Sequence, residues 1–308
     1  MRRPALALAA SLAAGLIVAA APQAGAAPCC MSATAFGTGR LLIWEDLAVG
    51  LRTSVAGGLG QWDGDGDWHP YVGYDELEWR SEIWGMGALS RRASVFARLP
   101  FVATRRAAGD LDGFGGGLAD VSAGLRYELL TIGEYVELPA IALTLSVTAP
   151  TGRATWGAAT PLGVDVTGRG AWALGAGVSV EHTELPWFVR FDLGVTVPLP
   201  AARPDLGGVD QRFGPELATD VAGGVELTDG VVTSLVARLT WAGEIVLDGR
   251  SVADSGRLDV GLGAALSWRF DPHWTLQLAV DTGLFADGLG DNQAGRVTGT
   301  VGLRYGVF

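Results

Sequence analysis

The sequence is poor in the residues on which most enzymes and metal proteins depend. It contains only three histidines and two cysteines among 308 residues. Positive charge is also scarce, because 22 Lys and Arg oppose 33 Asp and Glu and leave a net charge of -11. A chain this acidic lacks the basic surface with which proteins bind nucleic acid, so we exclude DNA and RNA as partners.

Long apolar runs are absent beyond the N-terminus. A membrane-spanning helix needs about 18 consecutive apolar residues, and the best later stretch, 138–149, is too short and contains Pro139. The mean hydropathy is nevertheless +0.29, and the chain has 46 glycines. High hydropathy without a spanning helix indicates apolar residues distributed over many β-strands, which is typical of a membrane barrel.

The N-terminus predicts export. Two arginines precede an apolar run that ends at Ala21, and small residues lead up to Ala26. A charged start, a short apolar middle and a small-residue exit are the parts of a secretory signal peptide, here 1–26. A short periplasmic N-terminal segment, 27–43, then precedes a β domain that covers 44–308.

Strict alternation of polar and apolar residues is the strongest signal in the chain. Segments 119–129, 187–197 and 257–270 all show it; in the first, Asp120 and Arg126 share the polar face. A period of two is that of a β-strand. These runs are about twice the ~5–6 residues of an average strand and near the ~9–11 that cross a bilayer at a tilt.

The same test predicts an all-β fold, a transmembrane antiparallel up-and-down β-barrel of about twelve strands. Bacterial barrels of this type have an even number of strands, with short periplasmic turns and long outer loops. The expected connections alternate in length in that way, and both termini then lie in the periplasm. The expected strands are 44–56, 75–85, 93–102, 119–129, 138–149, 169–181, 187–197, 215–227, 230–242, 257–270, 274–285 and 296–307.

Aromatic residues support a membrane barrel over the alternative, a secreted β-sandwich, whose strands also alternate. Aromatic rings favour the membrane interface, where an apolar body and a polar edge are both accommodated. The expected periplasmic ends of the strands carry Trp44, Tyr127, Trp187, Trp268, Trp274 and Tyr305, and the expected outer ends carry Trp79, Trp172 and Trp241.

Three segments resemble known outer-membrane proteins. Segment 113–130 (GFGGGLADVSAGLRYELL) is similar to a strand of the outer-membrane "transporter" family associated with meta-pathway phenol degradation, and 148–152 (TAPTG) resembles that family's exit into a loop. The C-terminal 301–308 (VGLRYGVF) resembles the assembly signal of outer-membrane barrels, except that Tyr305 and Phe308 fall on opposite faces. The resemblance implies a barrel and suggests passage of small hydrophobic or aromatic compounds.

Charged residues on the polar faces are expected to line the lumen, because a charge that faces lipid at mid-membrane costs about 2–4 kcal/mol. Rings of one sign would indicate ion selectivity, whereas the mixed signs here favour salt bridges across the interior, around either a narrow pore or a mostly filled lumen. The candidates are Arg52, Glu78, Arg80, Arg126, Glu128, Arg190, Asp192, Asp220, Arg238, Asp259, Asp281 and Arg304.

Two short motifs are candidate metal sites. Asp63, Asp65 and Asp67 have the spacing of the first ligands of a calcium loop, although Trp68 replaces the expected glycine and Tyr74 the expected glutamate. Cys29 and Cys30 are soft ligands that would suit Cu(I) or Zn, or would pair with another chain. The alternative for the first motif is a polar turn.

The sequence contains no convincing catalytic group. His69 is the single histidine in an expected outer loop, beside acidic residues with which a His–Asp pair can be imagined. We therefore expect a passive channel or transporter for small solutes, with no cofactor, in the outer membrane of a Gram-negative bacterium. Its partners would be outer-membrane lipid and the barrel-assembly machinery. The alternatives are a barrel enzyme that acts on lipids and a non-conducting structural or surface-binding barrel.

Overall fold

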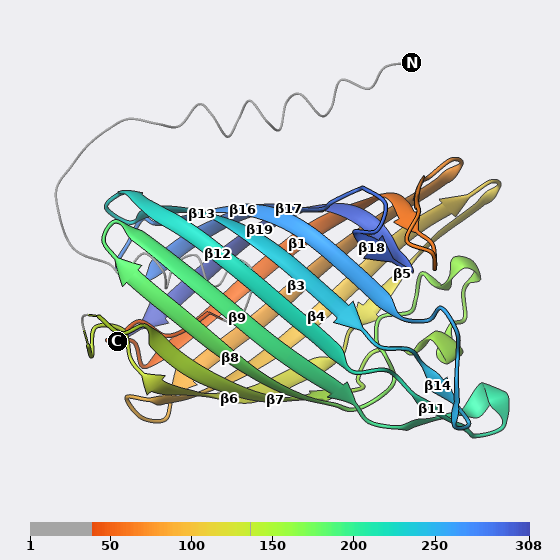
Figure 1. The fold of residues 1–308 in the computed structure, drawn as a ribbon, viewed down its shortest axis with the longest axis horizontal. Coiled ribbons are helices and arrows are strands. Elements are labelled where there is room, and N and C mark those ends of the chain that lie inside the picture. The colour runs from red at the N-terminus through yellow and green to blue at the C-terminus, as the bar shows by residue number, and fades with distance from the viewer. Residues whose placement is uncertain (1–38, 136) are drawn as a thin grey trace, which may run out of the picture.

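The computed structural model describes residues 39–135 and 137–308, and in it twelve antiparallel strands close into a barrel (Figure 1). The sequence prediction of the fold class is confirmed. The barrel strands are β1 (Leu47–Trp62), β3 (Tyr74–Ala88), β4 (Ala93–Ala108), β6 (Val121–Leu130), β7 (Ala140–Ala149), β8 (Ala173–Glu184), β9 (Trp187–Pro198), β12 (Glu216–Thr228), β13 (Val231–Ala242), β16 (Arg257–Arg269), β17 (Trp274–Gly283) and β19 (Gln293–Val307).

The first and last barrel strands close the cylinder. β1 pairs with β19 from Leu47 opposite Val307 to Trp62 opposite Gln293, with one bulge near Gly58. Every other barrel strand pairs with its neighbour in the chain, so the topology is a simple up-and-down meander. Closure removes the unpaired edges that an open sheet would expose to lipid.

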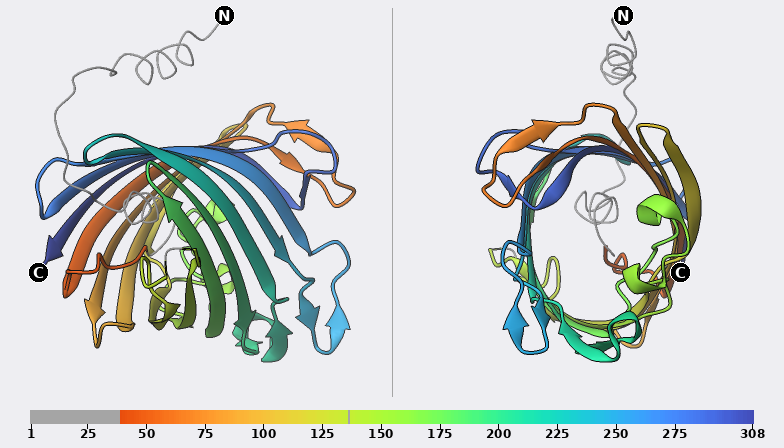
Figure 2. Two further views of the ribbon diagram at one scale, coloured as in Figure 1. Left: turned by 60° about the vertical axis from the view of Figure 1, so that its left-hand side comes forward. Right: turned by 90° about the vertical axis from the view of Figure 1, so that its right-hand side faces the viewer.

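The two ends of the barrel differ. At one end the strands are joined by short turns, such as 89–92 and 229–230; at the other they are joined by longer segments, such as 150–172. We call these the short-turn end and the loop end. Viewed along its axis the barrel is oval, and the segment that carries the 3-10 turns η1 (Thr155–Gly157) and η2 (Pro161–Gly163) folds inside the wall (Figure 2).

The loop end is more structured than the sequence predicts. β1, β3 and β4 continue beyond the expected boundaries, and the stretch 103–118, expected to be a loop, forms a hairpin of β4 with β5 (Leu111–Leu118). The glycine-rich sequence suggested a loop, but Gly116 approaches the Val102 carbonyl so closely that a Cβ atom would lie 2.3 Å from it. The close pairing of β4 with β5 therefore requires glycine at this position.

Short elements decorate the remaining loops. A small separate sheet joins the segments after β9 and β13, and two further strands pair with the ends of β1 and β16. The expected strand 169–181 in fact starts at Ala173, because the residues before it belong to the folded segment 150–172. These elements are β2 (Trp68–Pro70), β10 (Ala201–Arg203), η3 (Pro204–Leu206), β11 (Val209–Arg212), β14 (Val246–Leu247), β15 (Arg250–Ser251) and β18 (Gly290–Asp291).

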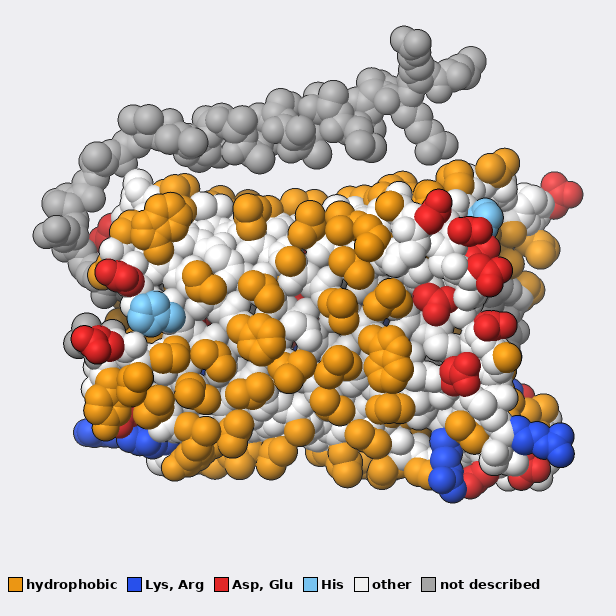
Figure 3. Space-filling model, viewed as in Figure 1, with side chains coloured by type: hydrophobic (Ala, Val, Ile, Leu, Met, Phe, Trp, Pro, Cys, Tyr) orange, Lys and Arg blue, Asp and Glu red, His pale blue; other side chains and the backbone are white. Residues whose placement is uncertain are grey.

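The outer surface between the two ends is apolar (Figure 3). Leu235 is 70% exposed on β13, and Val301 is 53% exposed on β19, so these side chains face the surroundings and not a core. Two outward hydroxyls, those of Thr53 and Ser81, lie directly opposite each other and form a hydrogen bond of 3.0 Å. Each hydroxyl thereby has a hydrogen-bond partner in an environment without water.

Aromatic rings lie at both edges of this apolar band. Trp187 and Trp268 are 62% and 48% exposed at the short-turn end, and Trp172 and Trp241 are 51% and 45% exposed at the loop end. This is the arrangement expected of interfacial girdles. Among the described residues, no helix is long and apolar enough to cross a membrane.

Candidate functional site

The lumen is crossed by ion pairs, and the most extended group lies on β9, β12, β13 and β17. Asp192 and Asp220 are directly opposite each other on neighbouring strands, a like-charge pair that would repel without counter-ions. Arg190 lies 2.6 Å from Asp192, and Arg238 lies 3.2 Å from Asp220 and 3.6 Å from Asp281. We call these five residues the Arg238 cluster.

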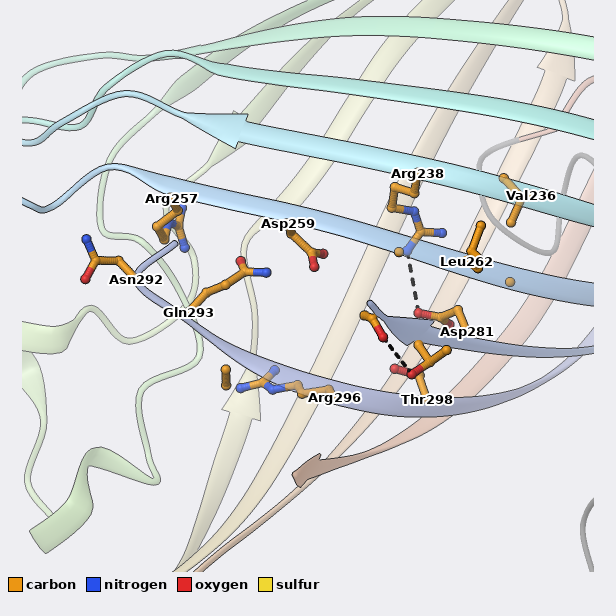
Figure 4. Close-up of a pocket in the computed structure, with 15 residues that line it drawn as sticks. Val236, Arg238, Arg257, Asp259, Leu262, Asp281, Asn292, Gln293, Arg296 and Thr298 are labelled. Carbon is orange, nitrogen blue, oxygen red and sulfur yellow. Dashed lines mark hydrogen bonds and ion pairs between the residues drawn. The ribbon is translucent and has the colours of Figure 1, made fainter. Parts of the chain in front are cut away.

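Small residues allow Arg238 to reach a strand that is not its neighbour. β16 lies between β13 and β17, and the lumen-facing positions opposite Arg238 and Asp281 on β16 are Gly261 and Gly263. Because neither glycine has a side chain, the guanidinium passes over β16 to the Asp281 carboxylate (Figure 4). The glycines of this strand therefore position the cluster.

The Arg238 cluster borders an open space inside the barrel. Asp259, Gln293, Arg296 and Thr298 line it together with members of that cluster (Figure 4). The cavity has a volume of about 420 Å³. Its walls carry both signs of charge.

A second group of ion pairs lies across the barrel seam, on β3, β4 and β19. The buried Glu76 carboxylate accepts hydrogen bonds from Arg106 at 2.9 Å and from Arg296 at 3.0 Å. Arg296 also lies 3.2 Å from Glu78, whose other oxygen is 3.7 Å from Arg80. Such a network stabilises the arrangement of these strands.

Residues 39–46 lie in the short-turn mouth of the barrel. Glu45 is buried and accepts hydrogen bonds from both terminal nitrogens of Arg304 on β19, one of them at 2.7 Å. Arg40 is also buried and lies 3.5 Å from Glu181 on β8 and 4.0 Å from Glu128 on β6. We call residues 39–46 the mouth segment.

Apolar packing adds to these ion pairs. Trp84, Met86 and Phe96 form a buried cluster inside the barrel with Ala48, and Leu41 of the mouth segment packs against it. Of the segment 27–43, expected to be a short periplasmic segment ahead of the barrel, the structure describes residues 39–43, which lie in the mouth at the short-turn end.

Segment 150–172 narrows the loop end. Asp165 is buried within it and accepts hydrogen bonds from the Thr160 hydroxyl and from Arg153, both at 2.5 Å, and from the Ala159 amide at 2.9 Å. These hydrogen bonds hold the pKa of Asp165 well below its usual range, with that from the Thr160 hydroxyl the largest cause. Arg106 in the lumen donates to the Leu162 carbonyl at 2.8 Å, which ties the segment to the wall.

The twelve charged residues singled out in the sequence all lie on the lumen faces of their strands. Arg52 contacts Glu82 at 2.7 Å and Arg126 contacts Glu128 at 2.8 Å, and both pairs are largely shielded from solvent. Whether any of the twelve binds a solute stays a prediction.

Several lumen residues were missed. Glu76 and Glu82 lie on the same alternating face as Glu78 and Arg80, so the same test would have identified them. Arg40 precedes the first expected strand. Glu45 and Arg169 fell in the first residues of the expected strands 44–56 and 169–181, which in the structure start at Leu47 and Ala173, so alternation could not place them. The residues missed are Arg40, Glu45, Glu76, Glu82, Arg98, Arg106, Arg169, Glu181, Glu216, Arg257 and Arg296.

The structure gives the metal predictions no support. Among the described residues, no group of three His, Cys, Asp or Glu side chains is placed to hold a metal ion. The Asp63 carboxylate accepts hydrogen bonds from the amides of Asp65 and Asp67 at 3.1 and 3.0 Å, as in a polar turn. Cys29 and Cys30 lie outside the described residues.

His69 pairs with an acid, as the sequence suggested. Its Nε2 lies 2.8 Å from an Asp63 oxygen, and the side chains are 57% and 39% exposed at the loop end. The hydrogen bond from His69 is the largest cause that lowers the pKa of Asp63. His182 lies on β8, and the His273 ring packs against Phe308 and lies 2.8 Å from the Gly306 carbonyl.

The chain belongs to a family of barrel proteins. Residues 53–286 match the family described as the MetA-pathway of phenol degradation. This match covers most of the barrel and agrees with the resemblance noted in segment 113–130. No match was found among curated protein sequences.

Solved structures share the fold. An outer membrane channel from Pseudomonas putida F1 superposes with a TM-score of 0.71 at 13% identity, over 85% of this chain and 96% of that one. The NanC porin superposes with a TM-score of 0.50 at 9% identity, over 84% of this chain and 100% of that one. These two structures are a channel and a porin, and at these identities they establish the architecture alone.

Proposed function

We propose that this protein is a passive channel through which small apolar or aromatic solutes cross the outer membrane. One observation carries the proposal: an apolar exterior closes around a polar interior that contains cavities of about 420 and 790 Å³. An apolar cavity of about 150 Å³ is enough to hold benzene, so either space accommodates a single-ring compound.

The family supports the choice of solute. Its name refers to phenol degradation, and a cell that degrades such compounds must first admit them through its outer membrane. A passive route requires neither a catalytic residue nor a cofactor. We therefore assign none.

The same proposal includes the orientation of the barrel in the outer membrane. The short-turn end faces the periplasm and the loop end faces outward, because outer-membrane barrels have short periplasmic turns and longer outer loops. Export by the signal peptide 1–26 and insertion by the barrel-assembly machinery complete this proposal. Solutes then enter beside segment 150–172 and leave beside the mouth segment.

The test is conductance and solute uptake by the refolded protein. In planar bilayers the protein should form ion-conducting pores, and in liposomes it should cause faster swelling in isotonic solutions of small permeating solutes than protein-free vesicles show. Correct folding is checked by the mobility difference between heated and unheated samples in detergent gels. A folded barrel that neither conducts nor admits any solute would rule out the channel.

A further inference from the structure

The cavity at the loop end carries an excess of positive charge, although the chain as a whole has a net charge of -11. Its volume is about 790 Å³. All 22 basic residues of the chain are arginines, and four of them line this one space beside two acids. The six charged lining residues are Arg80, Arg98, Arg169, Arg257, Asp120 and Glu216.

Both acids are already engaged by the protein. One Asp120 oxygen accepts a hydrogen bond from the Gly152 amide at 2.9 Å, and the other accepts one from the Arg169 amide at 2.7 Å. Glu216 is shared by two guanidinium groups, those of Arg169 and of Arg257, the latter at 2.9 Å. The two acids therefore hold the walls together and do not neutralise the remaining arginines.

Arg98 and Arg80 are those remaining arginines. The Arg98 guanidinium lies 5.5 Å from the centre of the Phe96 ring, and its Nε is buried without a hydrogen-bond partner. Arg98 forms no ion pair within 4.0 Å among the described residues. The acid that acts on it electrostatically, Glu82, is itself paired with Arg52 at 2.7 Å. The contact of Arg80 with Glu78 is 3.7 Å long, and the Arg80 side chain is 51% exposed to the cavity. Arg98 thus lines the cavity without an acceptor of its own, and a ligand oxygen in the cavity would supply one.

Apolar side chains line the same cavity. Pro100 lies on β4 between the levels of Arg80 and Arg98 and lines the cavity, as do Val166, Phe213 and Ile245. The Phe213 ring is itself covered by a guanidinium, at 5.7 Å from Arg169. The cavity thus offers planar cationic groups and an apolar wall to the same ligand.

We propose that this cavity is a binding site for small organic carboxylates with an apolar body, such as aromatic acids, and that Arg98 is its main anchor. A guanidinium matches the two oxygens of a carboxylate with parallel hydrogen bonds, which a point charge cannot do. The inference rests on the proposed channel and names a solute class for it. Neutral single-ring compounds would cross the channel without binding at this site.

The experiment measures single-channel current with benzoate as the probe. In a KCl gradient the reversal potential should show a preference for chloride over potassium. Benzoate added on the loop side should reduce the current in a saturable manner, whereas benzyl alcohol, which has the ring without the charge, and formate, which has the charge without the ring, should act at least tenfold more weakly.

Three variants locate the effect. Arg98→Gln should raise the half-blocking benzoate concentration about tenfold or more, because the variant loses the charge-assisted hydrogen bonds to the carboxylate. Arg98→Lys should keep the chloride preference but lose most of the benzoate block. Arg105→Gln is the matched control: the same charge is removed from the same strand, at an exposed residue paired with Asp112 outside the lumen.

The outcomes are distinct. Benzoate block that is equal in Arg98→Gln and Arg105→Gln, or equal block by benzoate and benzyl alcohol, would refute the carboxylate site while leaving the channel intact. A folded wild-type barrel that gave neither current nor solute uptake would instead refute the proposed function. If formate blocked the current as effectively as benzoate, the site would recognise anion charge alone, and the apolar part of the proposal would be refuted.

Discussion

A charge placed on the outer surface tests whether the apolar band contacts lipid. Leu235 is 70% exposed and lies between the level of Trp268, which is close to the short-turn edge, and that of Trp241 at the loop edge. An arginine there would meet hydrocarbon near the middle of the band. The expected cost of Leu235→Arg is about 2–4 kcal/mol, and 4 kcal/mol is close to a thousandfold in the folding equilibrium.

The control is Leu227→Arg, on the same hairpin but at its short-turn end. Leu227 is 52% exposed, and at the interface an arginine reaches water and costs about 0–1 kcal/mol. Both variants would be unfolded with denaturant in lipid vesicles, with tryptophan fluorescence as the signal. Equal destabilisation by the two substitutions, or none at Leu235, would mean that lipid does not cover the band.

Other predictions concern the two mouths. Glu45→Gln removes the counter-charge of the buried Arg304, so the mouth segment should loosen and single-channel current should become larger or noisier; unchanged current would show that the segment does not limit flow. The pKa of Asp165 is depressed, so its stabilisation of segment 150–172 is present above the ordinary range of an aspartate and is lost only as the pH falls to the lowered value; Asp165→Asn should therefore make the segment more sensitive to protease at neutral pH. His69→Ala should raise the pKa of Asp63 in an NMR titration and leave conductance unaltered.

The fold could be predicted because a strand that separates lipid from a polar lumen must alternate. Leu235 faces out and Ser234 faces in for that reason, and the same rule placed Arg238 and Asp281 inside. Alternation decides which face a residue occupies but not which partner it meets. The Arg238 contact with Asp281 crosses an intervening strand, so only the register of three strands reveals it.

The segments that lack an alternation of polar and apolar residues were the least predictable. Residues 150–168 of this segment were expected to be an outer loop. The fold of the segment depends on hydrogen bonds that backbone amides donate to Asp120 and Asp165, which no spacing rule indicates. Glu45 and Arg304 are 259 positions apart in the chain, and they meet only because the last strand returns beside the first. The arginine-rich cavity at the loop end depends both on the folded segment and on contacts between residues far apart in the chain, and the sequence did not predict it.

The position of Glu45 has a consequence for biogenesis. Its partner Arg304 is supplied by the final strand, so the two buried charges can neutralise each other only after that strand has docked against the first. An incomplete sheet would leave Glu45 without Arg304, and the mouth segment would be held only by the contacts of Arg40 and Leu41. Completion of the cylinder and full anchoring of the mouth segment are therefore coupled.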